Sequence, residues 1–281
     1  MAEYKHNHII PKCLIRQWST QHNNLNGVHA YEGDIRREYF SSDGGKKAFS
    51  FAIEKYFYVP KFNDQRIYQL EKWLSDVEGT FSFFIKALLQ GVTGPILKTP
   101  EEYHKLLLGI FSMNTRTKYD IDRIKQFMLE NPAIKRMVEM DEESDIEVAV
   151  LENMMNSTIE LAREYNQCRI IVCKNESGNL ILGDRPFLHK AVDGYSFLPL
   201  HPNFFISIIK APGQDYTYLG NTESKMIHLL NQKIAENSHN WIIAKDPTQL
   251  KEYISFFHLP KNHVTPYFQP VEYLQHGYKL I

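Results

Sequence analysis

The sequence lacks the features that identify several classes of protein. It has only three cysteines, Cys13, Cys168 and Cys173, and no two of them form a CxxC pair. An odd number of such cysteines excludes a disulfide-stabilised scaffold and indicates a reducing compartment. No run approaches the roughly 20 apolar residues of a membrane-spanning helix, and the first residues contain no apolar stretch of signal-peptide length. The sequence therefore predicts a cytoplasmic protein with no membrane partner.

The chain also lacks an excess of charge. Lysine and arginine number 32 against 33 aspartates and glutamates, which gives a formal charge of -1. A protein that binds duplex DNA normally carries surplus cations, because it must neutralise phosphates. Apolar residues make up 43% of the 281 residues, so the chain can bury a sizeable core.

Apolar periodicity predicts helices in the middle of the chain and strands at both ends. Two long helices are expected at 67–90 and 100–129, packed antiparallel because their apolar stripes match and their connection is short. Residues 28–40 read as a hairpin that turns at Gly33-Asp34, and 169–174 and 179–183 as a second hairpin. This segregation predicts an α+β fold, in which the strands of 169–210 join one mixed or antiparallel sheet with the N-terminal segment. A further helix is expected at 146–165, a strand or kinked pair at 197–210, and helix, strand and helix at 223–238, 241–245 and 248–257.

We expect one domain, residues 1–281, rather than two. Its parts are an N-terminal strand and hairpin region (1–60), a helical region (61–166), a strand-rich region (167–260) and a C-terminal tail (261–281).

Standard catalytic motifs are absent: there is no GxGxxG, Walker loop, GxSxG or HExxH. The N-terminal HNHIIPK resembles the opening of HNH nucleases, in which a histidine activates water beside a metal. That fold needs a further His or Asn on a helix, whereas His29 falls in the predicted hairpin. The alternative is that His8 is structural and packs under a loop.

A second resemblance covers most of the chain. The opening HIIPKCLIRQW is followed in order by AYEGD, IEKYFY, LEKWLSDVEGTF, MNTRT, LGDRPF, FLPLHP and LLNQKIAENSHNWIIAK. Over roughly residues 6–245 this series resembles the bacterial family called domain of unknown function 4238. The family implies no established activity. The matching positions are His8, Pro11, Arg16, Glu78, Arg116, Asp184, Pro186 and Asn231.

Some of these positions invite a functional interpretation beside a structural one. Glu78 lies two helical turns after Glu71 at one edge of the apolar stripe, so the two are either a solvated pair or carboxylates that face a cleft. Asn114 falls on an apolar stripe, where its amide either ties two helices together or faces a polar pocket. Arg116 lies on the opposite face and would need an anionic partner if it is buried. Asp184 ends a predicted strand, where it serves either a turn or an active site.

The functional hypothesis is a hydrolase that acts on a phosphodiester or nucleotide, as in a nuclease-like toxin or phage-defence effector. It assigns His8, Glu78 and Asp184 to catalysis, with Glu78 and Asp184 as candidate ligands of a divalent metal, and Arg16 and Arg116 as clamps for negative charge. Asn114 and Asn231 are candidate ligand-binding residues. The expected partner is a nucleic acid or nucleotide, or a protein encoded nearby. The alternative is a ligand-binding or protein-interaction module, in which Arg16–Glu78 and Arg116–Asp184 are structural ion pairs.

Overall fold

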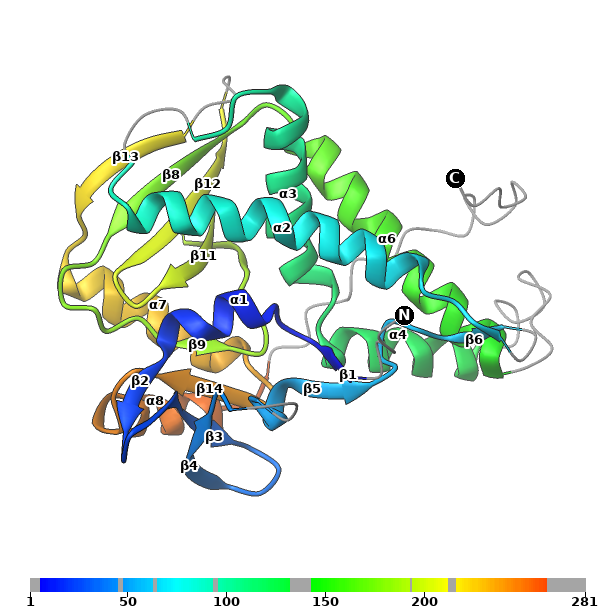
Figure 1. Cartoon of the computed structure of the whole chain (residues 1–281), viewed down its shortest axis with the longest axis horizontal. Coiled ribbons are helices and arrows are strands. Elements are labelled where there is room, and N and C mark those ends of the chain that lie inside the picture. The colour runs from blue at the N-terminus through cyan, green and yellow to red at the C-terminus, as the bar shows by residue number, and fades with distance from the viewer. Residues whose placement is uncertain are drawn as a thin grey trace.

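The computed structural model is an α+β protein, which confirms the predicted class (Figure 1). It describes residues 6–44, 48–62, 65–92, 96–131, 143–192, 194–211 and 216–261. All but the first residue of the predicted tail 261–281 lies outside this range. No helix in the described ranges is long and apolar enough to cross a membrane.

Most C-terminal strands form a five-stranded sheet in the order β10-β11-β12-β8-β13. Strand β13 runs parallel to β8, and the other neighbours are antiparallel. The predicted strand or kinked pair at 197–210 is the hairpin of β11 and β12, and its register shifts after Pro199, because proline interrupts a regular ladder. The strands are β8 (Cys168–Lys174), β10 (Leu188–Val192), β11 (Tyr195–His201), β12 (Phe204–Lys210) and β13 (Tyr216–Asn221).

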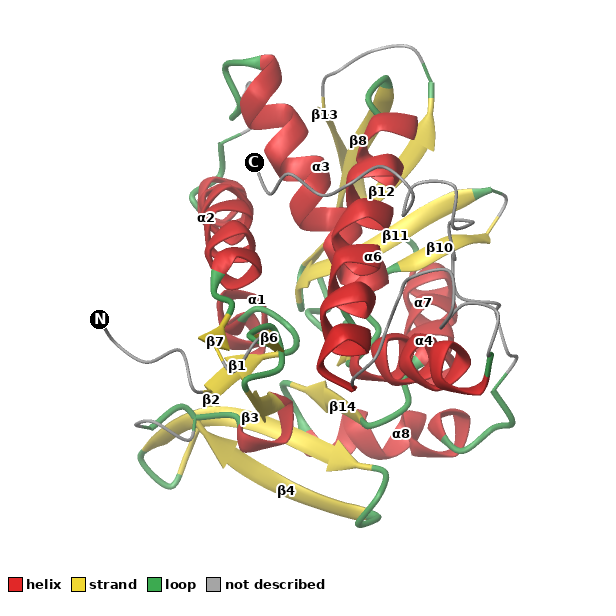
Figure 2. Ribbon diagram, turned by 90° about the vertical axis from the view of Figure 1, so that its right-hand side faces the viewer, coloured by secondary structure: helices red, strands yellow, loops and turns green. Residues whose placement is uncertain are grey.

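A second sheet combines strands from the N-terminal and C-terminal parts of the chain. Its order is β2-β3-β14-β9, and β4 also pairs with β3 in the hairpin predicted at Gly33-Asp34. Figure 2 shows it apart from the five-stranded sheet, below it in the view. The strands are β2 (Thr20–His22), β3 (Leu25–Glu32), β4 (Arg37–Ser42), β9 (Leu182–Gly183) and β14 (Trp241–Ala244). Two short pairs stand alone: β1 (His6–His8) with β5 (Ile53–Lys55), and β6 (Lys61–Phe62) with β7 (Gln65–Arg66).

The prediction of one sheet that contains 169–210 and the N-terminal segment is therefore wrong. Only β9 of that region reaches the N-terminal sheet, and β8 and β9 are not hairpin partners. Both edges of β8 are occupied, by β12 and β13, and the segment that leads to β9 is bonded by the amide of Asn231. This amide accepts from the Ile181 N–H and donates to the Asn179 carbonyl, so side-chain contacts satisfy backbone groups that a hairpin partner would otherwise bond. Gly183 then passes so close to Ser238 that a Cβ would lie 1.8 Å from its Oγ.

The predicted helices are present, but α2 and α3 cross steeply instead of packing antiparallel (Figures 1 and 2). Gly109 makes the crossing close, because an added Cβ would lie 3.2 Å from the Phe81 Cβ. The connection from Leu89 to Pro100 is long enough to permit this change of direction. The helices are α1 (Lys12–Ile15), α2 (Gln69–Leu89), α3 (Pro100–Thr115), α4 (Lys118–Glu130), α6 (Glu143–Glu164), α7 (Ser224–Asn237) and α8 (Pro247–Phe257).

The helix predicted at 100–129 is two helices. It begins at Thr99 with the expected N-cap and a capping box to Glu102, but α3 ends at Thr115. Thr117 then caps a new helix, α4, by accepting from the Asp120 N–H at 3.2 Å. The two residues at this break, Arg116 and Thr117, are both buried.

One hydrophobic core includes residues from all three regions of the sequence. Trp18 from the N-terminal region is fully buried in it and donates from Nε1 to the Leu180 carbonyl at 2.7 Å. Phe111 of α3 and Trp241 of β14 belong to the same core. A smaller cluster lies between α2, α4 and α6. The division into one domain stays a prediction.

Candidate functional site

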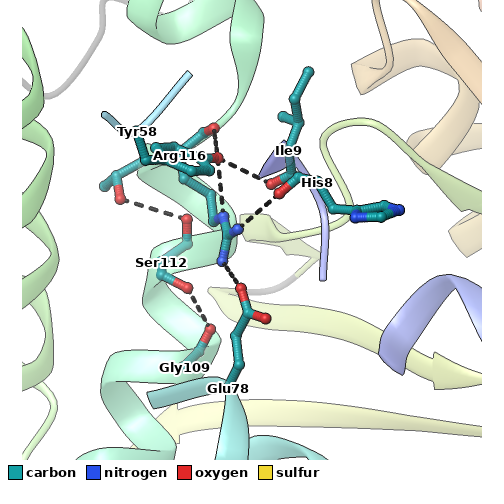
Figure 3. Close-up of polar contacts among 8 residues, drawn as sticks. His8, Ile9, Tyr58, Glu78, Gly109, Ser112 and Arg116 are labelled. Carbon is teal, nitrogen blue, oxygen red and sulfur yellow. Dashed lines mark hydrogen bonds and ion pairs between the residues drawn. The ribbon is translucent and has the colours of Figure 1, made fainter. Parts of the chain in front are cut away.

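The side chain of Arg116 is the centre of a buried polar network, the Arg116 cluster (Figure 3). Only 1% of Arg116 is exposed. Its Nη1 donates to Glu78 Oε1 at 2.6 Å, Nη2 to the His8 carbonyl at 3.0 Å, and Nε to the Tyr58 hydroxyl at 3.1 Å. One guanidinium thus connects α2, β1 and the end of α3.

Tyr58 completes the Arg116 cluster. Its hydroxyl lies 3.1 Å from the Ile9 carbonyl and 3.0 Å from the Arg116 carbonyl. Burial raises the pKa of Tyr58 to about 12, although the Arg116 charge opposes that rise, so the hydroxyl keeps its proton at neutral pH. Burial alone would lower the pKa of Arg116, but Tyr58 and Glu78 outweigh it and hold the guanidinium charged.

The His8 side chain points away from Arg116 and Glu78 (Figure 3). Its Nε2 lies 3.4 Å from the Ala48 carbonyl, which can only accept, so Nε2 carries the proton and Nδ1 the lone pair. The pKa of His8 is lowered to about 4, mainly by burial and further by the charges of Lys12, Arg116 and Arg16, against the Ala48 hydrogen bond. The imidazole is therefore neutral at pH 7.

Two cations whose charges act on this ring share one carboxylate. Arg16 donates from Nε and Nη2 to the Asp43 carboxylate at 2.7 and 3.2 Å, and Lys12 Nζ lies 3.2 Å from the same group. The side chain of Arg16 is 51% exposed and that of Lys12 30%. Burial would raise the pKa of Asp43, but the two cations outweigh it and lower it. We call His8, Lys12, Arg16 and Asp43 the His8 patch.

Asp184 lies in a different environment from His8 and Glu78. Its carboxylate accepts from the His239 N–H at 2.8 Å and from the Asn240 N–H and Nδ2 at 2.9 and 2.7 Å. It therefore closes the turn between α7 and β14. Burial raises the pKa of Asp184 to about 6, although these three N–H groups oppose the rise.

The alternative hypothesis pairs Arg16 with Glu78 and Arg116 with Asp184, and both pairings are wrong. Arg116 pairs with Glu78, and Arg16 pairs with Asp43. Asp184 and Glu78 belong to separate networks, so they do not form a shared metal site. Within the described residues, no three His, Cys, Asp or Glu side chains are arranged to hold a metal ion.

Of the two asparagines predicted to bind a ligand, Asn231 has a structural role instead, and the role of Asn114 stays a prediction. Asn231 is fully buried, and the two backbone groups named above occupy its amide. Asn114 is half-buried, and its side chain makes no hydrogen bond within the described part of the chain.

A family model described as "Protein of unknown function (DUF4238)" matches residues 6–248. The chain belongs to this family. The predicted resemblance is thereby confirmed, and the DUF4238 region contains every candidate residue from His8 to Asn231. No curated protein and no solved structure matches the chain.

Three members of these networks were not among the predicted site residues. Tyr58 lies in the IEKYFY segment of the DUF4238 resemblance, and Lys12 precedes Arg16 by one helical turn, so both had a signal in the sequence. Asp43 lies in a polar loop, where nothing distinguishes it from its neighbours. Its role depends on a contact with a residue 27 positions away.

Asp184→Asn is expected to change how stability depends on pH. The pKa of Asp184 is about 6 when folded against 3.8 for a free side chain, so the folded state binds the proton more tightly. Its contribution to stability is full below about pH 4 and is lost as the pH rises through 6. The unfolding free energy of the wild type minus that of the variant should fall by on the order of 3 kcal/mol between pH 4 and 7. Chemical denaturation across this range measures the difference.

Asp43→Asn provides a control of opposite sign. Because the pKa of Asp43 is lowered, its stabilisation is present above the unfolded pKa and is lost only as the pH falls. The same difference for this variant should stay flat from about pH 5 to 7 and decline in more acidic solution. If this difference in unfolding free energy did not change with pH for Asp184→Asn, the raised pKa of Asp184 would be contradicted.

Proposed function

We propose that this DUF4238 protein is a hydrolase that acts on a phosphodiester or a nucleotide at the His8 patch. The observation that carries the proposal is a neutral, half-buried imidazole on which the charges of two partly exposed cations act. Neutral imidazole can accept a proton, and ammonium and guanidinium groups bind phosphate oxygens. A cytoplasmic location accompanies the proposal and is supported by three free cysteines.

In the proposed reaction, His8 Nδ1 takes a proton from water as the water oxygen bonds to phosphorus. The ester P–O bond then breaks, and the leaving oxygen receives a proton from the imidazolium. A bound phosphate raises the pKa of His8 from about 4, because negative charge stabilises the protonated ring. Binding thus brings the imidazole closer to the pKa that acid–base catalysis at neutral pH requires.

Lys12 and Arg16 bind the substrate phosphate in this proposal. Both already share the Asp43 carboxylate at hydrogen-bonding distance, so an anionic acceptor fits between them. The Arg16 side chain is 51% exposed, and ion pairs of exposed arginines contribute only about 0–1 kcal/mol, so a phosphate can compete with Asp43 for this guanidinium.

Glu78 and Arg116 have a positioning role in this proposal, not the catalytic and clamping roles expected from the sequence. Their ion pair and the bond to the His8 carbonyl hold the backbone that carries the imidazole. Asp184 is left out of the reaction, because three N–H groups of a turn occupy its carboxylate. A divalent metal, if used, would enter with the substrate phosphate.

The test is turnover of single-stranded DNA, RNA and nucleotides by the full chain, with and without a divalent metal. We expect release of product from at least one of them. Arg16→Gln should raise KM by about tenfold, because it removes a charged hydrogen-bond donor to phosphate. Arg163→Gln removes the same charge from an exposed site on α6 and should leave KM unchanged.

The second candidate is a module without catalysis, and one observation favours it. Each of the three nitrogens of the Arg116 guanidinium has a partner within the protein, as expected of a structural side chain. In that case the protein binds a phosphorylated ligand or a partner protein without turnover. If the protein turned over none of the substrates but still bound at least one of them saturably, the module without catalysis would be the correct function.

A further inference from the structure

Four side chains from three separate segments gather at the start of α4, on the other side of the Arg116–Thr117 break from the Arg116 cluster. The ring of Tyr119 stacks on that of His239, with centroids 3.5 Å apart and planes 10° from parallel. The guanidinium carbons of Arg123 and Arg185 lie 5.3 and 5.4 Å from the Tyr119 centroid. We call these four residues the Tyr119 cluster.

Buried carboxylates hold this cluster in place. Arg185 Nη2 lies 3.2 Å from Asp120 Oδ1, while the second oxygen of Asp120 accepts from the Thr117 hydroxyl. Asp184 fixes the backbone of His239, as described above. Arg185 Nη1 also lies 3.5 Å from His239 Nε2. The guanidinium and the imidazole therefore have fixed positions before any ligand arrives, which lowers the entropic cost of binding.

The arginines of this region are more exposed than the carboxylates that hold them. Among the described residues, the cations Arg123, Arg185 and Lys261 lie near the carboxylates of Asp120, Asp184 and Glu236. Asp120 is 5% exposed and Asp184 2%, whereas the side chain of Arg185 is 13% exposed and Arg123 is half-buried. The two guanidinium groups thus reach solvent to a greater extent than the two carboxylates.

We propose that the Tyr119 cluster is a second anion site, which binds the phosphate group of a phosphorylated ligand. Arg123 and Arg185 approach from different elements, α4 and the segment after β9, and His239 adds a ring nitrogen. A planar carboxylate suits one guanidinium, whereas a phosphate presents oxygens in several directions and suits donors that converge. The Tyr119–His239 stack adds a planar aromatic surface, on which a base next to the phosphate can pack.

This site differs in residues and place from the His8 patch, and it requires no hydrolysis. Inorganic phosphate, a nucleoside 5′-monophosphate and a short single-stranded oligonucleotide share the recognised group, so comparing them identifies its source. Tighter binding of the nucleotide than of phosphate would assign a role to the aromatic stack. Tighter binding of the oligonucleotide than of the nucleotide would indicate a nucleic-acid strand.

The experiment is calorimetric titration of the full chain with these three ligands at low and high salt. We expect saturable binding of at least one ligand, with a Kd that Arg123→Gln raises by about tenfold. Arg163→Gln is the matched control, because it removes one positive charge from a helix outside the cluster. It should leave Kd within about twofold.

Three results would overturn the inference. The first is no saturable binding of any of the three ligands by the wild type. The second is an equal loss in Arg123→Gln and Arg163→Gln, which would indicate non-specific attraction to net charge. The third is a loss in Arg16→Gln with none in Arg123→Gln, which would assign the phosphate to the His8 patch. Circular dichroism of Arg123→Gln verifies that α4 remains folded.

Discussion

Replacement of Arg116 by alanine is expected to lower the free energy of unfolding by about 3–5 kcal/mol. The change removes the donors to Glu78, Tyr58 and the His8 carbonyl together. It leaves a carboxylate without its partner at a position that is only 27% exposed, and two buried oxygens without donors. Loss of one partner from a buried ion pair is costly because the remaining charge stays desolvated. Chemical denaturation at pH 7 measures the change.

Arg16→Ala is the matched control, because it also removes an arginine that is paired with a carboxylate at 2.7 Å. Its side chain is 51% exposed, so the expected loss is below about 1 kcal/mol. The double variant Arg116→Met/Glu78→Leu should recover part of the stability, since no unpaired charge then remains. Equal losses in Arg116→Ala and Arg16→Ala would show that the Arg116 cluster is not the buried centre that the geometry indicates.

His8→Gln should abolish most turnover if the His8 patch is catalytic. Glutamine can still donate to the Ala48 carbonyl, but it cannot take a proton from water. Loss of a general base typically reduces kcat by about 10²–10⁴-fold, and KM should change little because Lys12 and Arg16 remain. Steady-state kinetics on the preferred substrate measures both constants.

The pH profile of the wild type gives a second measure of the same group. The acidic limb of kcat/KM should fall near pH 4 to 5, because this ratio reports the free protein, in which the pKa of His8 is about 4. The acidic limb of kcat should lie at higher pH, since bound phosphate raises that pKa.

His201→Gln is the control for His8→Gln. The pKa of His201 is also lowered to about 4 by burial, but its Nδ1 accepts from the Asn203 N–H in a turn outside the patch. Activity should survive this substitution. Turnover that persists in His8→Gln, or is lost equally in His201→Gln, would remove His8 from the reaction.

Local chemistry made much of the fold predictable. The start of α3 is predictable from Thr99, Pro100, Glu101 and Glu102, because the capping side chains and the backbone N–H groups that they bond lie within one helical turn. The break at Thr117 was missed although Thr117 and Asp120 have capping chemistry, because apolar positions on both sides fit one helical spacing. The segment between β8 and β9 bonds to Asn231, about 50 residues later in the chain, and β8 pairs with β12 and β13, and no local pattern contains these contacts.

The candidate site was less predictable than the fold. The sequence indicated that a buried Arg116 would need an anion, and it has one. It could not indicate which anion, because Glu78 and Asp184 both carry the required charge and the choice depends on tertiary geometry. Asp184 illustrates the same limit: it does end a strand, yet it bonds to a turn and not to a cleft.

The pairing of β3 with β14 has a consequence for synthesis of the chain. Ala30 lies opposite Ile243, more than 200 residues later. At about 5–20 residues per second, a ribosome needs roughly 10 to 40 s to make the intervening segment. During that interval the hairpin of β3 and β4 has left the ribosome without its β14 neighbour, and an incompletely paired sheet edge is prone to associate with other chains. Nascent chains stalled before residue 241 should therefore bind chaperones more strongly than chains released after residue 261.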